Sequence, residues 1–469
     1  MSCTAKDARG DARVAITKLS EPVYSEAVAL AAIGRAANEL GLAEDSRGPL
    51  AGVIPAGARV LIKPNFVMHE NQGPWGIEPL VTHPSIIRAT VMLSLLAGAS
   101  QVMVGDAPVQ GCDFDRLLSE TGLDEWAADL ESVEPRFKGI HDFRRTTCVF
   151  VDGVRIASEN LQQEDRFVLF DLGRDSLLEP ITDDSGSFRV TCYDPRLMAR
   201  THGPGRHQYL VAKDVMEADV IINLPKLKTH KKAGVTCALK NLIGINGNKE
   251  FLPHHRAGGS ASGGDCYPGA SLVKRALEYS LDRQNQTTSF VAGRLWREVA
   301  VNLERISIRS GDKLGVEGSW SGNDTVWRTG LDLNRILLYG QTDATLAEVP
   351  RRRVFHIVDA VVAGQGDGPL RPEPLPLGLV FMGANAAAVD WVGARLLGYD
   401  PSRISIVREA FADFRWPITS YTPGEVKLSG DFGAGSADRI LTSRETPAVI
   451  YPAGWQAAAN SAQPDLRII

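Results

Sequence analysis

The sequence predicts an α/β protein built on a mostly parallel, Rossmann-like sheet, with helices on both faces and an inserted β-rich segment. The first observation is a β-α-β pattern between residues 58 and 108, in which two apolar runs flank a stretch with helical periodicity. The second is ADVIINLP at 218–225, a continuous apolar run typical of a buried parallel strand. The third is a pair of strand-like runs, 352–364 and 378–385, followed by a helical pattern.

The elements before residue 125 predict the first part of this core. Residues 1–12 are polar and charged, which predicts a disordered tail. The core then begins at residue 13 with a strand, followed by an Ala-rich helix at 26–42 and by the β-α-β unit. Crossovers between parallel strands are right-handed, so both strands of that unit end at the same edge of the sheet. In open α/β sheets this edge is where ligands bind.

The remaining chain divides into an insertion and the second part of the core. Residues 125–210 contain short alternating stretches separated by Asp, Gly and Pro, which predicts antiparallel hairpins inserted beside the sheet. Residues 211–469 restore the core pattern, with helices expected at 270–282 and 290–304. The Gly/Ser-rich stretch 256–269 is expected to be a mobile loop beside the site.

Composition excludes several classes of protein. The 469 residues are 44% hydrophobic and 23% charged, as in ordinary globular proteins, and the net charge of -5 gives no general attraction to nucleic acid or to anionic membranes. The six cysteines form no C-x-x-C pair, so we expect reduced thiols and no iron–sulfur cluster. The polar N-terminus and the lack of a long apolar stretch predict a cytoplasmic protein that does not bind membranes.

The segment 223–256 has the opposite charge from the rest of the chain. It holds six lysines and one arginine against one glutamate, a local net charge of +6. Lysines offer mobile donors to phosphate, sulfate or carboxylate, and the segment begins where a predicted strand ends. We therefore predict an anionic small-molecule ligand, the alternative being a solvated basic loop.

Polar residues at several strand ends complete the predicted site. The candidate catalytic residues are Lys63, Asp106 and His230, with His230 as the acid or base. The predicted substrate-binding residues are Asn65, Asn223, Lys226, Lys228, Lys240, Asn241 and Asp359. Lys63 and Asp106 could equally form a structural ion pair. We expect the strand ends to converge and to place Lys63, Asp106, Asn223, Lys226 and Asp359 around one cleft.

Other polar residues leave alternatives open. A divalent metal is possible through His230, His254, His255 or Asp265, although their spacing matches no standard metal motif. The turn with Asn323 and Asp324 lies between two tryptophans and fits either a sugar or nucleoside site or a packed turn. His83 precedes a proline at a predicted helix start, which favours capping or packing over catalysis.

Several motifs together resemble the family called domain of unknown function 362. They are KPNFV, THPSIIRATV, VGDAP, ADVIINLPKLKTH and GVTCALKNLIG, followed by VDAVVAGQGDGPL and NAAAVDWVGARLLG. The resemblance implies an α/β fold and a bacterial or archaeal protein, but no reaction. Many relatives carry ferredoxin-like cysteine clusters, and this sequence has none. The polar positions implied by the motifs are Lys63, Asn65, His83, Asp106, Asn223, Lys226, Lys228, His230, Lys240, Asn241, Asp359 and Asp390.

Three functions follow as hypotheses. The first is an enzyme that binds a phosphorylated or carboxylated metabolite and performs isomerase, lyase or transferase chemistry. The second is a redox or metal-dependent accessory protein related to the iron–sulfur members. The third is a non-catalytic anion-binding protein, in which no ionisable group of the pocket would have a strongly shifted pKa. The sequence does not identify a cofactor or an oligomeric state.

Overall fold

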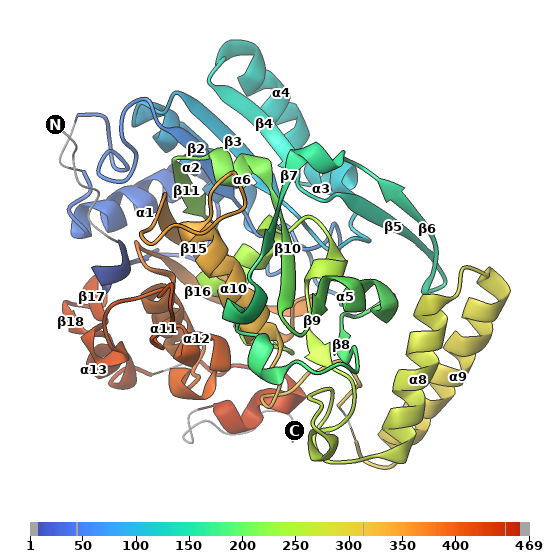
Figure 1. The fold of residues 1–469 in the computed structure, drawn as a ribbon. Coiled ribbons are helices and arrows are strands. Elements are labelled where there is room, and N and C mark those ends of the chain that lie inside the picture. The colour runs from blue at the N-terminus through green and yellow to red at the C-terminus, as the bar shows by residue number, and fades with distance from the viewer. Residues whose placement is uncertain (1–7, 44–45, 313, 446, 460–469) are drawn as a thin grey trace.

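The computed structural model describes residues 8–43, 46–312, 314–445 and 447–459. The strands of its central sheet are β1 (Arg13–Lys18), β2 (Arg59–Lys63), β3 (Gln101–Asp106), β4 (Phe137–Asp142), β11 (Val220–Asn223), β12 (Lys226–His230), β13 (Gly234–Thr236), β15 (Arg353–Asp367), β16 (Arg371–Gly383), β17 (Lys427–Gly430) and β18 (Gly435–Ser436). The order across the sheet is β18-β17-β1-β16-β15-β11-β2-β3-β4, and β12 and β13 extend it beside β15 (Figure 1).

The sheet is mostly parallel, which confirms the predicted fold class. Strands β15, β11, β2, β3 and β4 all run in one direction. The exception inside the sheet is β16, which pairs antiparallel with both β15 and β1. Asn223 lies opposite Lys63 on one side and His356 on the other, so polar residues from three strands meet at one level.

Helices cover both faces of the sheet because the side chains of each strand alternate in direction. On β2, Val60 and Ile62 pack in the cluster formed with α1 (Glu26–Glu39) and α2 (Pro84–Leu96). Leu61, between them, packs on the opposite face with residues of α10 (Val326–Tyr339). Helix α11 (Ala386–Leu396) covers the same face further along, beside β1 and β16.

The segment 125–210 is rich in strands, but part of it belongs to the central sheet. Strand β4 pairs with β3 as the parallel edge strand. This edge strand was not predicted because FKGIHD has little apolar alternation, so its place depends on packing against its neighbours. The rest forms the hairpin β5 (Thr146–Val151)–β6 (Val154–Asn160) and the small sheet of β7 (Phe167–Asp171), β10 (Arg206–Ala212) and β9 (His202–Gly203).

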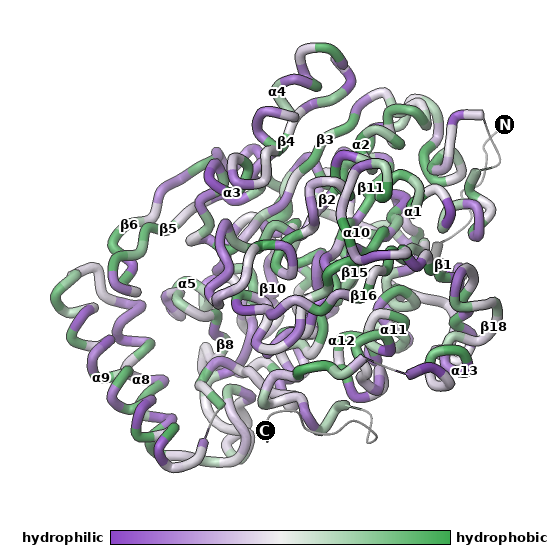
Figure 2. The backbone as a smooth tube through the Cα atoms, turned by 180° about the vertical axis from the view of Figure 1, so that it is seen from behind, coloured by the Kyte–Doolittle hydropathy of each residue, from purple (hydrophilic) through white to green (hydrophobic). Residues whose placement is uncertain are grey.

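The two helices predicted near 270–304 form a projecting hairpin. They are α8 (Leu272–Gln286) and α9 (Phe290–Arg309), which stand away from the sheet in Figure 1. Hydropathy alternates along both helices in Figure 2, as expected for helices with one buried face. The shorter elements are α3 (Phe114–Glu120), α4 (Leu123–Val133), α5 (Pro195–Thr201), α6 (Lys213–Glu217), α7 (Ala238–Asn241), α12 (Ser405–Glu409), α13 (Ala437–Thr442), β8 (Phe188–Arg189) and β14 (His255–Arg256).

The ends of the chain are described only in part. Residues 1–7 of the predicted tail lie outside the described residues, whereas Ala8–Gly10 form a short 3-10 helix and Arg9 donates to the Tyr339 hydroxyl at 3.1 Å. Within the described ranges, no helix combines the length and apolar character needed to cross a membrane.

Candidate functional site

A cavity of about 630 Å³ opens at the carboxyl ends of β2 and β3. Its walls come from the loop after β2, the loop after β3, β12, α7 and the segment 246–254, with smaller parts from 190–192 and 369–370. Its charged and imidazole side chains are His69, Glu70, Asp106, Arg144, Lys228, His230, Lys231, Lys232, Lys240, Lys249, His254 and Glu317. The cavity therefore lies where open α/β sheets bind ligands.

Lys63 and Asp106 form a buried ion pair at the floor of this cavity. The Lys63 Nζ donates to Asp106 Oδ1 at 2.7 Å and also to Pro64 O and Asn241 Oδ1, which uses all three of its protons. Burial lowers the pKa of Lys63 and raises that of Asp106, and the attraction between the two charges opposes both shifts. Of the two, only Asp106 lines the cavity, so Lys63 positions Asp106 rather than meeting a ligand.

Asn241 belongs to a second buried network. Its Nδ2 donates to Asn223 Oδ1 at 2.8 Å, and Asn223 in turn bonds Ala238 O and His356 Nδ1, both at 3.0 Å. Asn241 lines the cavity and Asn223 does not. Asn223 therefore acts on the cavity only through the orientation of Asn241.

Lys226 and Asp359 form another buried pair, and neither lines the cavity. Their Nζ and Oδ2 atoms are 2.6 Å apart, and the Tyr24 hydroxyl donates to Asp359 Oδ1 at 2.7 Å. The ring of His83 stacks on Tyr24 at 3.7 Å, and its Nδ1 accepts from Ser85 N at the start of α2, as a capping residue does. Of the five residues expected around one cleft, Asp106 lines this cavity, whereas Lys63, Asn223, Lys226 and Asp359 do not.

The lysines that reach the cavity differ in their partners. Lys231 pairs with Glu317 at 3.0 Å, and Lys232 donates to Thr191 Oγ1 at 2.5 Å, 3.9 Å from Glu317. Although burial alone would raise the pKa of Glu317, Lys232 and Lys231 hold it at about 2. Lys228 is fully buried and donates to Leu80 O, and burial, Lys226 and Lys240 hold its pKa well below its usual range.

Lys240 is the exception among these lysines. Its Nζ has no hydrogen-bond or ion-pair partner among the residues that the structure describes, and its side chain lines the cavity from α7. Burial, together with the nearby charges of Lys232 and Lys63, lowers its pKa to about 7. A substantial fraction of this amine is therefore uncharged at neutral pH.

Hydrogen bonds to the Nδ1 atoms assign opposite tautomers to two cavity histidines. The His230 Nδ1 accepts from the backbone N–H groups of Lys232 and Ala233, at 3.0 and 3.2 Å, so in the neutral ring Nε2 carries the proton. The His254 Nδ1 lies 2.7 Å from Leu252 O and must donate, so its Nε2 carries the lone pair. Burial lowers both pKa values well below 6.5, so both rings are neutral. His230 can donate a hydrogen bond to a ligand, and His254 can accept a proton.

Unsatisfied oxygens also face this region. Asn65 Oδ1 and Thr236 Oγ1 are buried without a hydrogen-bond partner in the described structure, and both residues line the cavity. Buried polar atoms normally find partners, so these two atoms are available to a ligand or water. Asn65 is among the residues predicted from the sequence, whereas Thr236, Thr191 and Glu317 are not, because they occupy ordinary polar positions without a motif.

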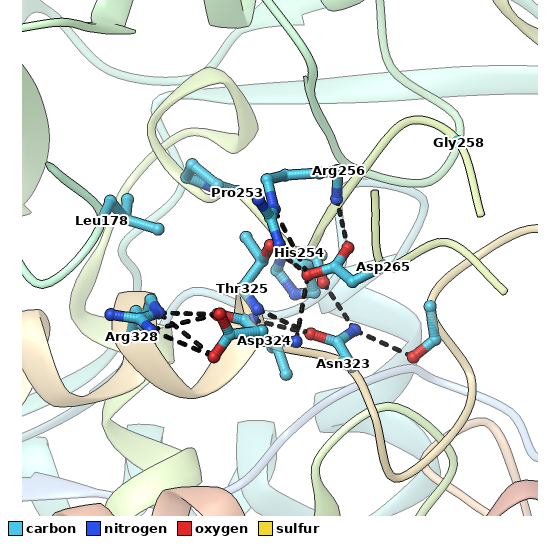
Figure 3. Close-up of polar contacts among 12 residues, drawn as sticks. Leu178, Pro253, His254, Arg256, Gly258, Asp265, Asn323, Asp324, Thr325 and Arg328 are labelled. Carbon is cyan, nitrogen blue, oxygen red and sulfur yellow. Dashed lines mark hydrogen bonds and ion pairs between the residues drawn. The ribbon is translucent and has the colours of Figure 1, made fainter. Parts of the chain in front are cut away.

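The turn with Asn323 and Asp324 fixes the segment that carries His254 (Figure 3). Asn323 Nδ2 donates to His254 O at 2.9 Å, and its Oδ1 accepts from two N–H groups at the start of α10. Asp265 accepts from the N–H groups of Arg256 and Asp324 and so joins the two segments. Asp324 pairs with Arg328. The bonds favour the packed-turn alternative for these residues.

A comparison with protein-family models finds a match to Domain of unknown function (DUF362) over residues 60–168 and 179–395. This chain belongs to the DUF362 family. It is also 26% identical over 216 residues to the thylakoid-associated protein sll1697 of Synechocystis, an alignment that covers 46% of this chain and 48% of that protein. The chain thus spans about half the length of the curated relative.

Solved structures similar to this DUF362 chain align with low scores. A Thermotoga maritima protein gives a TM-score of 0.31 at 11% identity, covering 76% of this chain and 55% of that one. The lactate racemase apoprotein from Thermoanaerobacterium thermosaccharolyticum gives a TM-score of 0.29 at 11% identity, and the alignment covers 85% of this chain and 59% of that one.

The side chains proposed for a metal do not form one group in this DUF362 member. Among the described residues, no cluster of three or more His, Cys, Asp or Glu could hold a metal ion. His254 lines the cavity, whereas its neighbour His255 does not, as the alternation of an extended segment requires. Asp265 is engaged with backbone N–H groups and the Thr325 hydroxyl. Cysteines 112, 148, 192, 237 and 266 are unpaired, and Cys3 lies outside the described residues.

Replacing Asn323 by Ala is expected to lower the free energy of unfolding by about 2–3 kcal/mol. The change removes a helix-start acceptor, worth about 1 kcal/mol, and leaves buried carbonyl groups without their donor. The matched control is Asp113→Ala, which removes an exposed acceptor at the start of α3 and should cost about 1 kcal/mol. Urea unfolding of both variants measures the difference, and equal losses would show that Asn323 is only a helix cap.

Proposed function

We propose that this protein is an enzyme that binds a carboxylated or phosphorylated small molecule in the 630 Å³ cavity and acts on it by acid–base chemistry. The observation that carries the proposal is Lys240, an unpartnered amine in a cavity that also holds the Nε2 lone pair of His254. Groups with shifted pKa values that converge in a cavity are typical of active sites.

The charges of the cavity support an anionic ligand. Lys228 bonds only a backbone carbonyl and Lys240 has no described partner, whereas Lys232 bonds a hydroxyl and shares Glu317 with Lys231 at 3.9 Å. The neutral His230 adds an N–H donor beside them. Burial and the neighbouring lysines disfavour the charged forms of Lys228 and Lys240, and a bound anion would offset that repulsion.

The remaining lining supports an organic ligand with an apolar part. Val67, Met68, Phe150 and Leu370 line the same cavity as the basic groups. Isomerase, lyase or transferase chemistry is consistent with one proton acceptor, His254, and one electrophilic donor, His230. This arrangement assigns His230 a donor role, whereas the sequence favoured it as the acid or base.

The test is the stabilisation of the fold by simple anions. Sulfate or phosphate at millimolar concentration should raise the melting temperature of the wild type more than chloride at matched ionic strength, because a ligand stabilises the state that binds it. Lys240→Met should remove most of this specific response. The control Lys138→Met removes one charge at an exposed position outside the cavity and should leave the response intact.

The comparison between variants is decisive because sulfate also stabilises many proteins by exclusion from their surfaces. That general effect is the same in wild type, Lys240→Met and Lys138→Met. An equal sulfate response in all three proteins would contradict an anion site at Lys240.

A further inference from the structure

Three groups of the cavity lining take part in no ion pair of the described structure: the amine of Lys240, the Nε2–H donor of His230 and the Nε2 lone pair of His254. We propose that Lys240 is a nucleophile that forms a Schiff base with the carbonyl group of a 2-oxo acid. This inference rests on the proposed function and adds a substrate class to it. A 2-oxo acid carries both the carboxylate that the cavity lysines favour and a carbonyl carbon that an amine can attack.

The surroundings of Lys240 keep its amine available for such an attack. Lysine becomes nucleophilic when burial and neighbouring cations favour the uncharged amine. The charges that act on Lys240 are those of Lys232, after β12, and Lys63, at the end of β2. Lys228 and His230 on β12 and His254 from the segment before β14 line the same cavity, and Lys240 in turn lowers their pKa values. The carboxylates of the cavity lining are Glu70, Asp106 and Glu317. Asp106 is held by Lys63 and by Phe66 N, and Glu317 is paired with Lys231 and Lys232.

The two histidines have the tautomers that this step requires. Lys240, His230 and His254 all line the same cavity. The Nε2–H of His230 can donate to the carbonyl oxygen, where negative charge develops during attack. The Nε2 lone pair of His254 can accept the proton that the Lys240 nitrogen loses.

The step balances without a redox partner. The Nζ lone pair forms a bond to the carbonyl carbon, the C–O π bond breaks, and the oxygen takes a proton. The nitrogen loses one proton to give a neutral carbinolamine. Its lone pair then expels the hydroxyl group, which takes a second proton and leaves as water, and the resulting C=N–H⁺ group loses its N–H proton to give the neutral imine. Amine plus carbonyl thus gives imine plus water, and hydrolysis reverses it. Lys232, whose Nζ bonds the Thr191 hydroxyl, is the group proposed to hold the carboxylate of the substrate.

The step is tested by trapping with pyruvate as the probe. The full-length protein is incubated with pyruvate and sodium cyanoborohydride, which reduces an imine to a stable secondary amine, and the modified lysines are mapped by peptide mass spectrometry. We expect labelling of Lys240 at pH 7 at least tenfold faster than of the exposed Lys138, with a rate that rises with pH to a plateau above about 7. Lys240→Arg should lose this adduct.

Two further measurements separate the possible results. Acetone, a carbonyl compound without a carboxylate, should label Lys240 at least tenfold more slowly than pyruvate if Lys232 holds the carboxylate. His254→Gln should slow the labelling, but Lys240 should remain the residue that is labelled.

Labelling spread evenly over surface lysines, or directed to Lys232, would overturn the Schiff-base proposal. If the sulfate response depends on Lys240 but no adduct forms there, only the Schiff base fails; if the sulfate response is also absent, the proposed function fails with it.

Discussion

Asp359→Asn is expected to lower the free energy of unfolding by about 3–5 kcal/mol, because it leaves the buried Lys226 without its counter-charge. Both side chains are completely buried, and their Nζ and Oδ2 atoms are 2.6 Å apart. Asp359 also accepts from the Tyr24 hydroxyl and from His83 N, so the change weakens a junction between β15, α1 and α2. The loss is measured from urea unfolding of wild type and variant.

The control for this loss is an ion pair at the surface. Glu120→Gln removes the partner of Arg116, whose Nε lies 2.7 Å from Glu120 Oε1, and both side chains are more than two-fifths exposed. Exposed pairs contribute about 0–1 kcal/mol. A loss of less than 1 kcal/mol in Asp359→Asn, similar to that of the control, would show that Lys226 is accommodated without a counter-charge.

Lys240→Met is expected to stabilise the ligand-free protein. Transfer of an unpartnered ammonium group from water into the cavity is costly, and burial is the main cause that lowers the Lys240 pKa from 10.5 to about 7. One pKa unit corresponds to about 1.4 kcal/mol, so the cost at low pH is at most about 4 to 5 kcal/mol. Methionine fills a similar volume without a charge.

The pH dependence of this gain has a definite sign. Between pH 7 and 10.5 the unfolded chain binds a proton at Lys240 that the folded protein does not, so this group makes the folded wild type more stable as pH rises. The advantage of Lys240→Met should therefore be largest below pH 7 and disappear above about 10.5. Unfolding measured at pH 6 and at pH 9 tests it, with Lys138→Met, at an exposed position outside the cavity, as the control. A variant less stable than the wild type at pH 6 would contradict the cost of the buried amine.

The family motifs and the buried strands were predictable because they depend on local sequence. A run such as ADVIINLP is apolar on both sides, which suits a strand covered by helices on both faces. This run contains β11, which lies between β2 and β15 in the sheet. The helices α8 and α9 were predicted from their periodicity and differ only at their ends. The direction of β16 and the place of β4 were not predictable, since both depend on pairing with strands far along the chain.

The sequence by itself determined the α/β class, the family and the concentration of basic residues between 223 and 256. Only the tertiary structure decided which of those charges remain unpaired, because their partners come from distant segments: Asp359 meets Lys226, and Glu317 meets Lys231. It also decided the tautomers of His230 and His254, which depend on the backbone groups that face each ring. The net charge of a sequence segment counts every lysine as +1. In the folded protein, burial and pairing with distant residues make the lysines different, and Lys240 is the amine of this cavity that has no partner within the described structure.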